Sequence, residues 1–117
     1  TKDFYYIHKT HHETKYEELT YLHAGKGDIL ENIIQYSSLS IPLIIIKFDL
    51  FQFLIAFTLI QIRGLMRHDH NYVWLIGNHH LLHHKNRRYN YGEYWLDTLF
   101  GTKYPNSDEY VYGVIYT

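Results

Sequence analysis

The longest apolar stretch of the chain lies in its middle, between Leu39 and Ile62. It holds 17 apolar residues out of 24, enough hydrophobicity for a membrane span. Lys47 and Asp49 interrupt it, and each would cost roughly 2.5–3.5 kcal/mol at the centre of a bilayer. We therefore expect the chain to turn at residues 47–49, with a helix on either side. Each arm of this hairpin has about 17–18 residues, or roughly 25–27 Å, close to the thickness of one hydrocarbon core.

Capping signals mark where both arms begin. Asp28 with Glu31, and Asp49 with Gln52, have the spacing of a capping box at a helix N-terminus. Outside the arms, the pattern predicts helices over residues 3–21, 79–85 and 93–100, and little strand. The sequence therefore predicts an all-α protein.

The charges predict how the hairpin is oriented. Of the 11 Lys and Arg residues, only Lys47 lies at the turn, and the other ten lie toward the two ends of the chain. The positive-inside rule then places both ends in the cytoplasm. We expect an integral membrane helical hairpin with a cytoplasmic, histidine-rich helical cap. A soluble hairpin buried in a partner or a homodimer stays open, because the first arm begins with polar residues: Asn32, Gln35, Ser37, Ser38 and Ser40.

The composition narrows the chemistry of the chain. Its 117 residues suffice for one domain, and a net charge of −1 gives no reason to expect nucleic acid as a partner. The chain has no cysteine, which excludes disulfides, thiolate catalysis and cysteine-based zinc sites. It has 10 histidines, so nitrogen-ligated metal chemistry is the class that this composition favours.

Two histidine boxes share the spacing H-x-x-H-H: the first is His8, His11 and His12, and the second is His80, His83 and His84. On a helix, positions i, i+3 and i+4 lie on one face, so three imidazoles can converge on a metal. Random placement of histidines would give only about 0.07 such matches. An even number of membrane crossings separates the boxes, which returns them, with the histidines just after the second arm, to one side. The candidate metal ligands are His8, His11, His12, His68, His70, His80, His83 and His84.

The ligand type limits the metal and the site. Imidazoles without thiolates suit iron, zinc, copper or nickel rather than calcium or magnesium. Eight histidines exceed the four ligands of a structural zinc and suit two metals. The chain has neither the H-E-x-x-H motif of zincin proteases nor the Glu-x-x-His motif of soluble di-iron bundles. Asp69 and Asp97 could orient the imidazoles, and Asp69 could equally be a solvated residue at a helix end.

Several motifs together resemble the fatty acid hydroxylase/sterol desaturase superfamily. They are His8–His12, His79–His84, Tyr89-Asn90-Tyr91-Gly92 and the Leu99-Phe100-Gly101-Thr102 tetrapeptide. The resemblance implies a histidine-ligated di-iron centre, on the cytoplasmic face of the endoplasmic reticulum or another membrane. It also implies the use of O2 and of electrons from NAD(P)H, delivered by a cytochrome b5-like partner, to hydroxylate or desaturate a lipid. By the same resemblance, the box histidines and those near 68–70 ligate the metals.

The chain departs from that family in two places. Members of the family usually carry an earlier His-x3–4-His box on a preceding membrane helix, so we expect residues 1–117 to be one domain that is incomplete at its N-terminus. Gly64 stands where some relatives have a second histidine before His68. His70 can replace it only if the helix ends there, because positions i and i+2 do not share a helix face.

These observations lead to three hypotheses. The first is a membrane-bound oxidoreductase with two irons, which hydroxylates or desaturates a fatty acyl chain or a sterol; zinc could replace iron in purified material. The second is a non-catalytic or degenerate membrane protein that binds zinc. The third, a metal transporter, is weaker because its histidines should lie along the spans. No catalytic residue beyond the metal ligands is predicted.

Overall fold

The computed structural model describes residues 6–47 and 49–115, and these are helical with no β-strand. The longer elements are helices α2 (Ile29–Ile45) and α3 (Leu50–Met66). Three short α-helices follow, α4 (Val73–Ile76), α5 (His79–Lys85) and α6 (Tyr94–Phe100). Five 3₁₀ turns complete the order: η1 (Thr10–Glu13), η2 (Tyr16–Glu18), η3 (Tyr21–His23), η4 (His70–Tyr72) and η5 (Ser107–Glu109). The prediction of an all-α fold is confirmed for this part of the chain.

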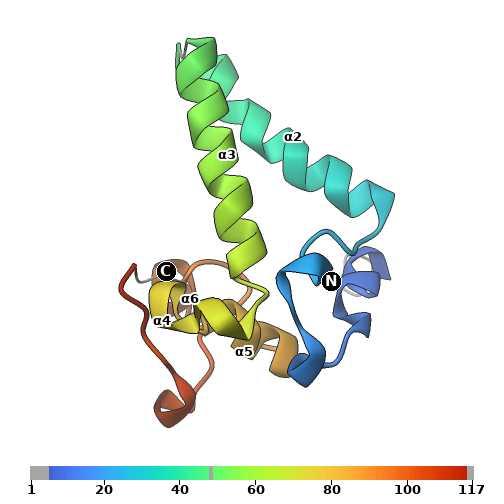
Figure 1. Cartoon of the computed structure of the whole chain (residues 1–117), viewed down its shortest axis with the longest axis vertical. Coiled ribbons are helices and arrows are strands. Elements are labelled where there is room, and N and C mark those ends of the chain that lie inside the picture. Colours follow the sequence, from blue (N-terminus) through green and yellow to red (C-terminus); the bar gives the residue numbers. More distant parts are fainter. Residues whose placement is uncertain (1–5, 48, 116–117) are drawn as a thin grey trace.

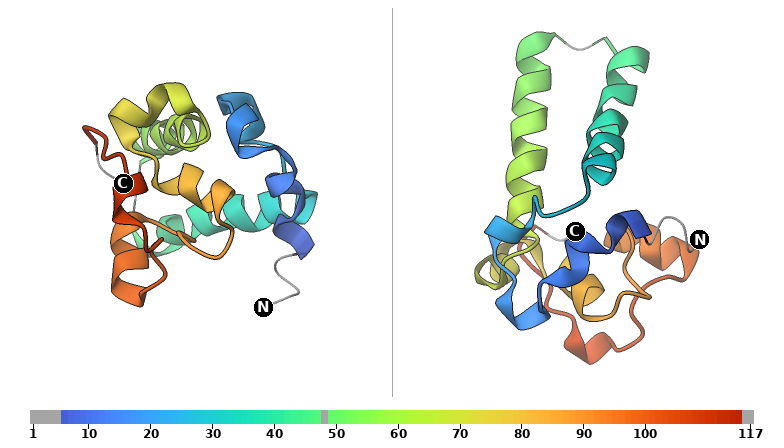
Figure 2. Two further views of the ribbon diagram at one scale, coloured as in Figure 1. Left: turned by 90° about the horizontal axis from the view of Figure 1, so that it is seen from below. Right: turned by 90° about the vertical axis from the view of Figure 1, so that its right-hand side faces the viewer.

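Helices α2 and α3 form two arms that diverge from the turn between them (Figure 1). Both arms begin at the predicted aspartates. Asp28 accepts a hydrogen bond from the backbone N–H of Leu30, and Asp49 accepts one from that of Gln52. The rest of the described chain gathers at the open end of the arms, as the right-hand view in Figure 2 shows. The even number of long helices thus brings the two histidine-rich segments to one end of the molecule.

The arms present apolar side chains to their surroundings. No residue of α3 is buried, and Leu50 and Phe51 are each more than 70 % exposed. No single helix in the described ranges is long and apolar enough to cross a membrane; α3 together with residues His70–Ile76 meets the test only as a pair bent by 110°. Each arm has 17 residues, which explains this outcome because about 20 are needed for one span. The membrane hairpin therefore stays a prediction.

The segment before α2 differs from the single helix predicted over residues 3–21. Its described part is helical at residues 6–8 and then forms the turns η1, η2 and η3, separated by extended residues such as Thr14 and Leu19. The physical reason is burial. His11, His12 and Leu19 all point into the protein, and a straight helix could not wrap these residues around one site.

Helix α5 lies at the centre of the histidine-rich end. Leu81 and Leu82 are each 1 % exposed, and His79 is 2 % exposed. The C-terminal segment packs against α4: Val114 and Ile115 donate backbone hydrogen bonds to the carbonyls of residues 74 and 75. The buried residues are mostly polar, and six of them are histidines: His11, His12, His68, His79, His83 and His84. A polar core of this kind must satisfy its nitrogen atoms in some way.

Candidate metal centre

Seven of the eight predicted ligands converge in two groups at the open end of the arms. Group A consists of His11, His68, His80 and His84, and group B of His8, His12 and His83. Within each group, one nitrogen of every ring lies within 4.8 Å of the others. Each group combines residues from the N-terminal segment and from α5, and group A adds His68 from the turn just after α3. The two boxes are thus interleaved, so neither box forms a site by itself.

The spacing of the nitrogen atoms matches that around a metal ion. In group A, His68 Nε2 lies 2.9 Å from His11 Nε2 and 3.0 Å from His80 Nε2. With metal–nitrogen bonds of about 2.1 Å, two ligand nitrogens are about 3.0 Å apart at 90° and about 3.4 Å apart in a tetrahedron. The observed separations therefore leave room for an ion between the rings.

Group B has the same spacing. His12 Nε2 lies 2.8 Å from His8 Nε2 and 3.1 Å from His83 Nε2. Its three imidazoles leave at least one ligand position for another molecule, as catalytic metal sites with three protein ligands do. Group A already supplies four nitrogens, so the two positions are not equivalent.

Hydrogen bonds on the outer side of the rings orient these nitrogens. His11 Nδ1 donates to the carbonyl of Lys26 and His68 Nδ1 to that of Gly64, both at 2.8 Å, and His83 Nδ1 donates to the carbonyl of Tyr89 at 2.7 Å. A proton on Nδ1 leaves the lone pair on Nε2 to face the group. Lone pairs about 3 Å apart repel each other, and a cation between them removes that repulsion.

Several buried ring nitrogens have no partner within the described residues. Both nitrogens of His84 and Nδ1 of His12 are buried without a hydrogen bond. Such groups cost free energy unless a ligand satisfies them. A metal at group A would satisfy one nitrogen of His84. The donor set, its spacing and these orphaned nitrogens together fit a pair of metal ions that prefer imidazole.

The protonation state of the rings fits the same conclusion. Burial lowers the pKa of His68 and of His83 to about 4, and that of His12 to about 2. Burial of the ring also lowers the pKa of each of the other ligands of group A, His11, His80 and His84. These imidazoles are therefore neutral near pH 7, which is the form that binds a metal.

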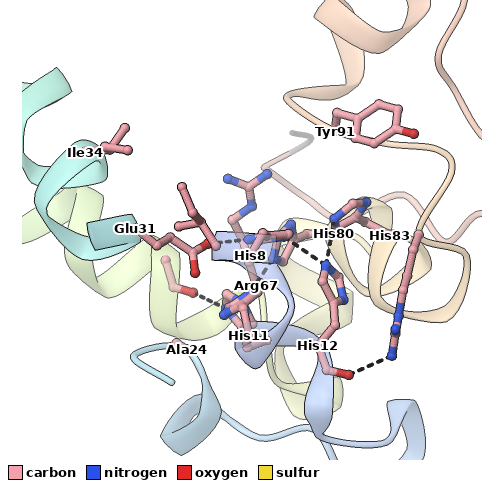
Figure 3. A pocket seen from close by; sticks show the side chains of 14 residues that line it. His8, His11, His12, Ala24, Glu31, Ile34, Arg67, His80, His83 and Tyr91 are labelled. Carbon is pink, nitrogen blue, oxygen red and sulfur yellow. Dashed lines mark hydrogen bonds and ion pairs between the residues drawn. The ribbon is translucent and has the colours of Figure 1, made fainter. Parts of the chain in front are cut away.

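A cavity of about 690 Å³ lies against both groups (Figure 3). Ile34 of α2, Gly64 of α3 and Ala24 line the part near the arms, while Tyr91 lines the part beyond α5. Arg67 also lines the cavity, and its guanidinium is paired with Glu93, 3.0 Å away. Near the arms the cavity wall thus combines the small or apolar Ala24, Ile34 and Gly64 with the charged Glu31 and Arg67, and the histidines form another part of the wall.

Four other singled-out residues lie outside the two groups. His70 is exposed, and its Nε2 donates to the carbonyl of Tyr16 at 2.8 Å, so the structure does not bring it to the other predicted ligands. Asp69 accepts from the backbone N–H groups of Tyr21 and Asn71 and orients none of the seven histidines. Asp97 accepts from His79 Nε2 at 3.0 Å, and His79 belongs to neither group.

Sequence reasoning missed Glu31 and Tyr91, which line the cavity. Glu31 was assigned only to the capping box, although its side chain pairs with His8. The available signal was its place in the first turn of α2, four residues after Gly27. Tyr91 lies in the Tyr-Asn-Tyr-Gly motif, and its ring contacts that of His83 with centroids 5.7 Å apart. Tyrosine has no ligand spacing to reveal such a role.

Comparison with known proteins bears on the same residues. The family model for fatty acid hydroxylases matches residues 1–102, which include both histidine boxes and all of the cavity lining. No curated protein and no solved structure matches the chain. The match covers most of the 117 residues. The chain therefore belongs to the fatty acid hydroxylase family, a family of membrane-associated oxidoreductases that are usually metal-dependent.

Proposed function

We propose that this protein is a membrane-bound di-iron oxygenase that uses O2 to hydroxylate a lipid, either a fatty acyl chain or a sterol. The observation that carries the proposal is the position of groups A and B: six of their seven imidazoles line a cavity that also contacts Ile34 of α2 and Gly64 of α3. Desaturation of the same substrates would use the same centre, and the residues of the cavity do not favour it over hydroxylation.

Groups A and B would each hold one iron through ring nitrogens that face inward. The chemistry that iron supplies when bound is the reductive activation of O2, as in other non-haem iron oxygenases. The overall reaction converts R–H, O2, two electrons and two protons into R–OH and water. The chain's own histidines fix the positions of the metals, and the backbone carbonyls of Lys26, Gly64 and Tyr89 keep three of the rings in orientation.

The cavity would hold the part of the lipid that reacts. Ile34 and Gly64 lie on the two arms and line the same cavity as the histidines, so an apolar chain that enters between α2 and α3 would reach the histidines past these two residues. The salt bridge between Arg67 and Glu93 lies at this wall and keeps both charges paired. Apolar contact along the arms would orient the substrate, and closeness to group B, with its free ligand position, would select the C–H bond.

The exposed apolar arms support insertion into a membrane. Leu50, Phe51, Leu54 and Leu59 are each more than half exposed, and water solvates such side chains poorly. In our proposal the arms lie in the bilayer of the endoplasmic reticulum or a related membrane. The histidine-rich end faces the cytoplasm, where NAD(P)H-derived electrons arrive through a cytochrome b5-like donor.

One observation favours a second candidate, a zinc-binding protein without turnover. Group A offers four imidazoles, the ligand number of a structural zinc site. Zinc has no redox chemistry, so the two candidates differ in their response to O2 and a reductant.

The test is incorporation of labelled oxygen. The detergent-purified protein is reconstituted with Fe²⁺, supplied with a reductase, a cytochrome b5 and NADPH, and given a fatty acyl or sterol substrate under ¹⁸O2. The proposal predicts a hydroxylated product that carries ¹⁸O and is absent when zinc replaces iron. Full iron loading without any oxidised product from either substrate class would contradict the proposal and favour the zinc-binding candidate.

A further inference from the structure

Glu31 connects the first arm to the metal centre. It lies in the first turn of α2, and its side chain reaches back to the N-terminal segment, where it pairs with His8 Nδ1. Figure 3 shows this carboxylate between Ile34 and the histidines, with a dashed line to His8. The opposite nitrogen of the same ring, His8 Nε2, faces His12 Nε2, another nitrogen of group B. Glu31 therefore contacts a predicted ligand on its outer side and is not itself a member of either group.

The environment of this carboxylate is specific. The Glu31 side chain is 20 % exposed, and its second oxygen, Oε2, is buried without a hydrogen bond from the described residues. A Cβ placed on Gly27 would lie 2.9 Å from Oε2, so the absence of a side chain at Gly27 gives the carboxylate its room. A buried carboxylate oxygen without a donor is costly unless a positive charge lies nearby.

The outer partner of His8 differs from those of the other ligands. The Nδ1 atoms of His11, His68 and His83 donate to neutral backbone carbonyls. A carboxylate in that position fixes the tautomer of the imidazole and also raises its basicity, which strengthens its bond to a metal. Among the described residues of groups A and B, His8 has this carboxylate partner, and it belongs to group B.

We propose that Glu31 is a positioning residue for the metal of group B, which orients His8 and supplies the negative charge that compensates a cation bound there. The inference rests on the proposed metal centre. It makes the two positions differ in a defined way: group A is held by four imidazoles, and group B by three imidazoles and the charge of Glu31. It also links the arm that would bind substrate to the metal position that has a free ligand site.

The experiment is a titration of the metal-free, detergent-purified chain with Zn²⁺ in competition with a chelator, which requires neither O2 nor electrons. The test variant is Glu31→Gln, which keeps the shape and removes the charge. The control is Glu17→Gln, at an exposed position of η2. A further variant, Gly27→Ala, moves the carboxylate without removing it. Helical content by circular dichroism shows that each variant is folded.

We expect the parent chain and Glu17→Gln to bind two zinc ions. Glu31→Gln should bind one ion with parental affinity and the other about 10–100-fold more weakly. Gly27→Ala should weaken the same ion, and Glu31→Asp should restore part of its affinity.

Parental affinity for both ions in Glu31→Gln would overturn the inference. Equal weakening of both ions in a folded Glu31→Gln chain would also overturn it, because the carboxylate contacts a ligand of group B alone. Failure of the oxygenase proposal would leave this zinc result unchanged, so the two failures are distinguishable. A parent chain that binds no zinc would refute both.

Discussion

Acidification should destabilise the metal-free chain well before its carboxylates titrate. His68 and His83 are 7 % and 5 % exposed, and burial lowers the pKa of each from 6.5 to about 4. In the unfolded chain both residues regain the ordinary value. Between pH 6.5 and pH 4 the unfolded state therefore binds more protons than the folded state, so stability falls as the pH falls.

The size of the effect follows from these values. Above pH 6.5 the folded state keeps its full stability with respect to these two groups. Below pH 6.5, each histidine lowers the free energy of unfolding by up to about 1.4 kcal/mol per pH unit. Integrated from pH 7 to pH 5, the loss is about 2 kcal/mol for each, or about 4 kcal/mol for the pair. For a chain of this length, that loss lowers the melting temperature by roughly 15 °C. His12, with a pKa lowered to about 2, adds to the effect with the same sign.

The assay is thermal unfolding of the chelator-treated protein in a neutral detergent, followed by circular dichroism at several pH values. The variant His83→Gln removes one of the titrating groups, so its loss between pH 7 and pH 5 should be about 2 kcal/mol smaller than that of the parent chain. A melting temperature that stays constant from pH 7 to pH 5 would refute the reasoning, because it would show that these imidazoles are not buried in their neutral form.

Four substitutions test the metal ligands, the buried Asn90 network and the cavity wall. His83→Ala should weaken metal binding at group B by at least about 100-fold, whereas His70→Ala should leave both ions bound; equal effects on chelator-competition titrations would contradict the assignment. Asn90→Ala should lower the free energy of unfolding by roughly 3–5 kcal/mol. Asn90 is fully buried, has φ of 57° and makes three side-chain hydrogen bonds, all of which the variant loses. A loss below 1 kcal/mol would show that this network is unimportant. Gly64→Leu should keep the metal content, since a Cβ at Gly64 meets nothing within 4 Å. Because Gly64 lines the cavity, the added side chain should lower the turnover of bulky substrates. Unchanged turnover would mean that substrate does not pass Gly64.

The sequence was informative where a short-range rule applies. Asp28 and Asp49 cap the two arms as their spacing predicts, and Gly101 ends α6 in the left-handed region with φ of 67°. The predicted pair of helical arms returns the chain to one end of the molecule, where His12 and His83, 71 positions apart in the chain, lie in contact; whether the arms cross a membrane stays a prediction.

Sequence reasoning failed where long-range packing decides the outcome. Helical spacing predicted one face for His8, His11 and His12, whereas the structure divides them between groups B and A. Nothing in the spacing shows which ring pairs with which across the fold. His70 was assigned to the site because it is close to His68 in sequence, but η4 directs it toward Tyr16. The capping box predicted for Asp28 and Glu31 is only half confirmed: Asp28 accepts from the N–H of Leu30, whereas the Glu31 side chain pairs with His8.

The central claim is that groups A and B together hold two metal ions that react with O2. The most direct measurement is the iron content of the protein after anaerobic loading with Fe²⁺ and removal of the excess, followed by exposure to O2. The account predicts about two irons per chain, a loss of one in His83→Ala, and oxidation of the bound iron that depends on O2. A parent chain that retains no iron, or that retains the same amount in His83→Ala, would contradict it.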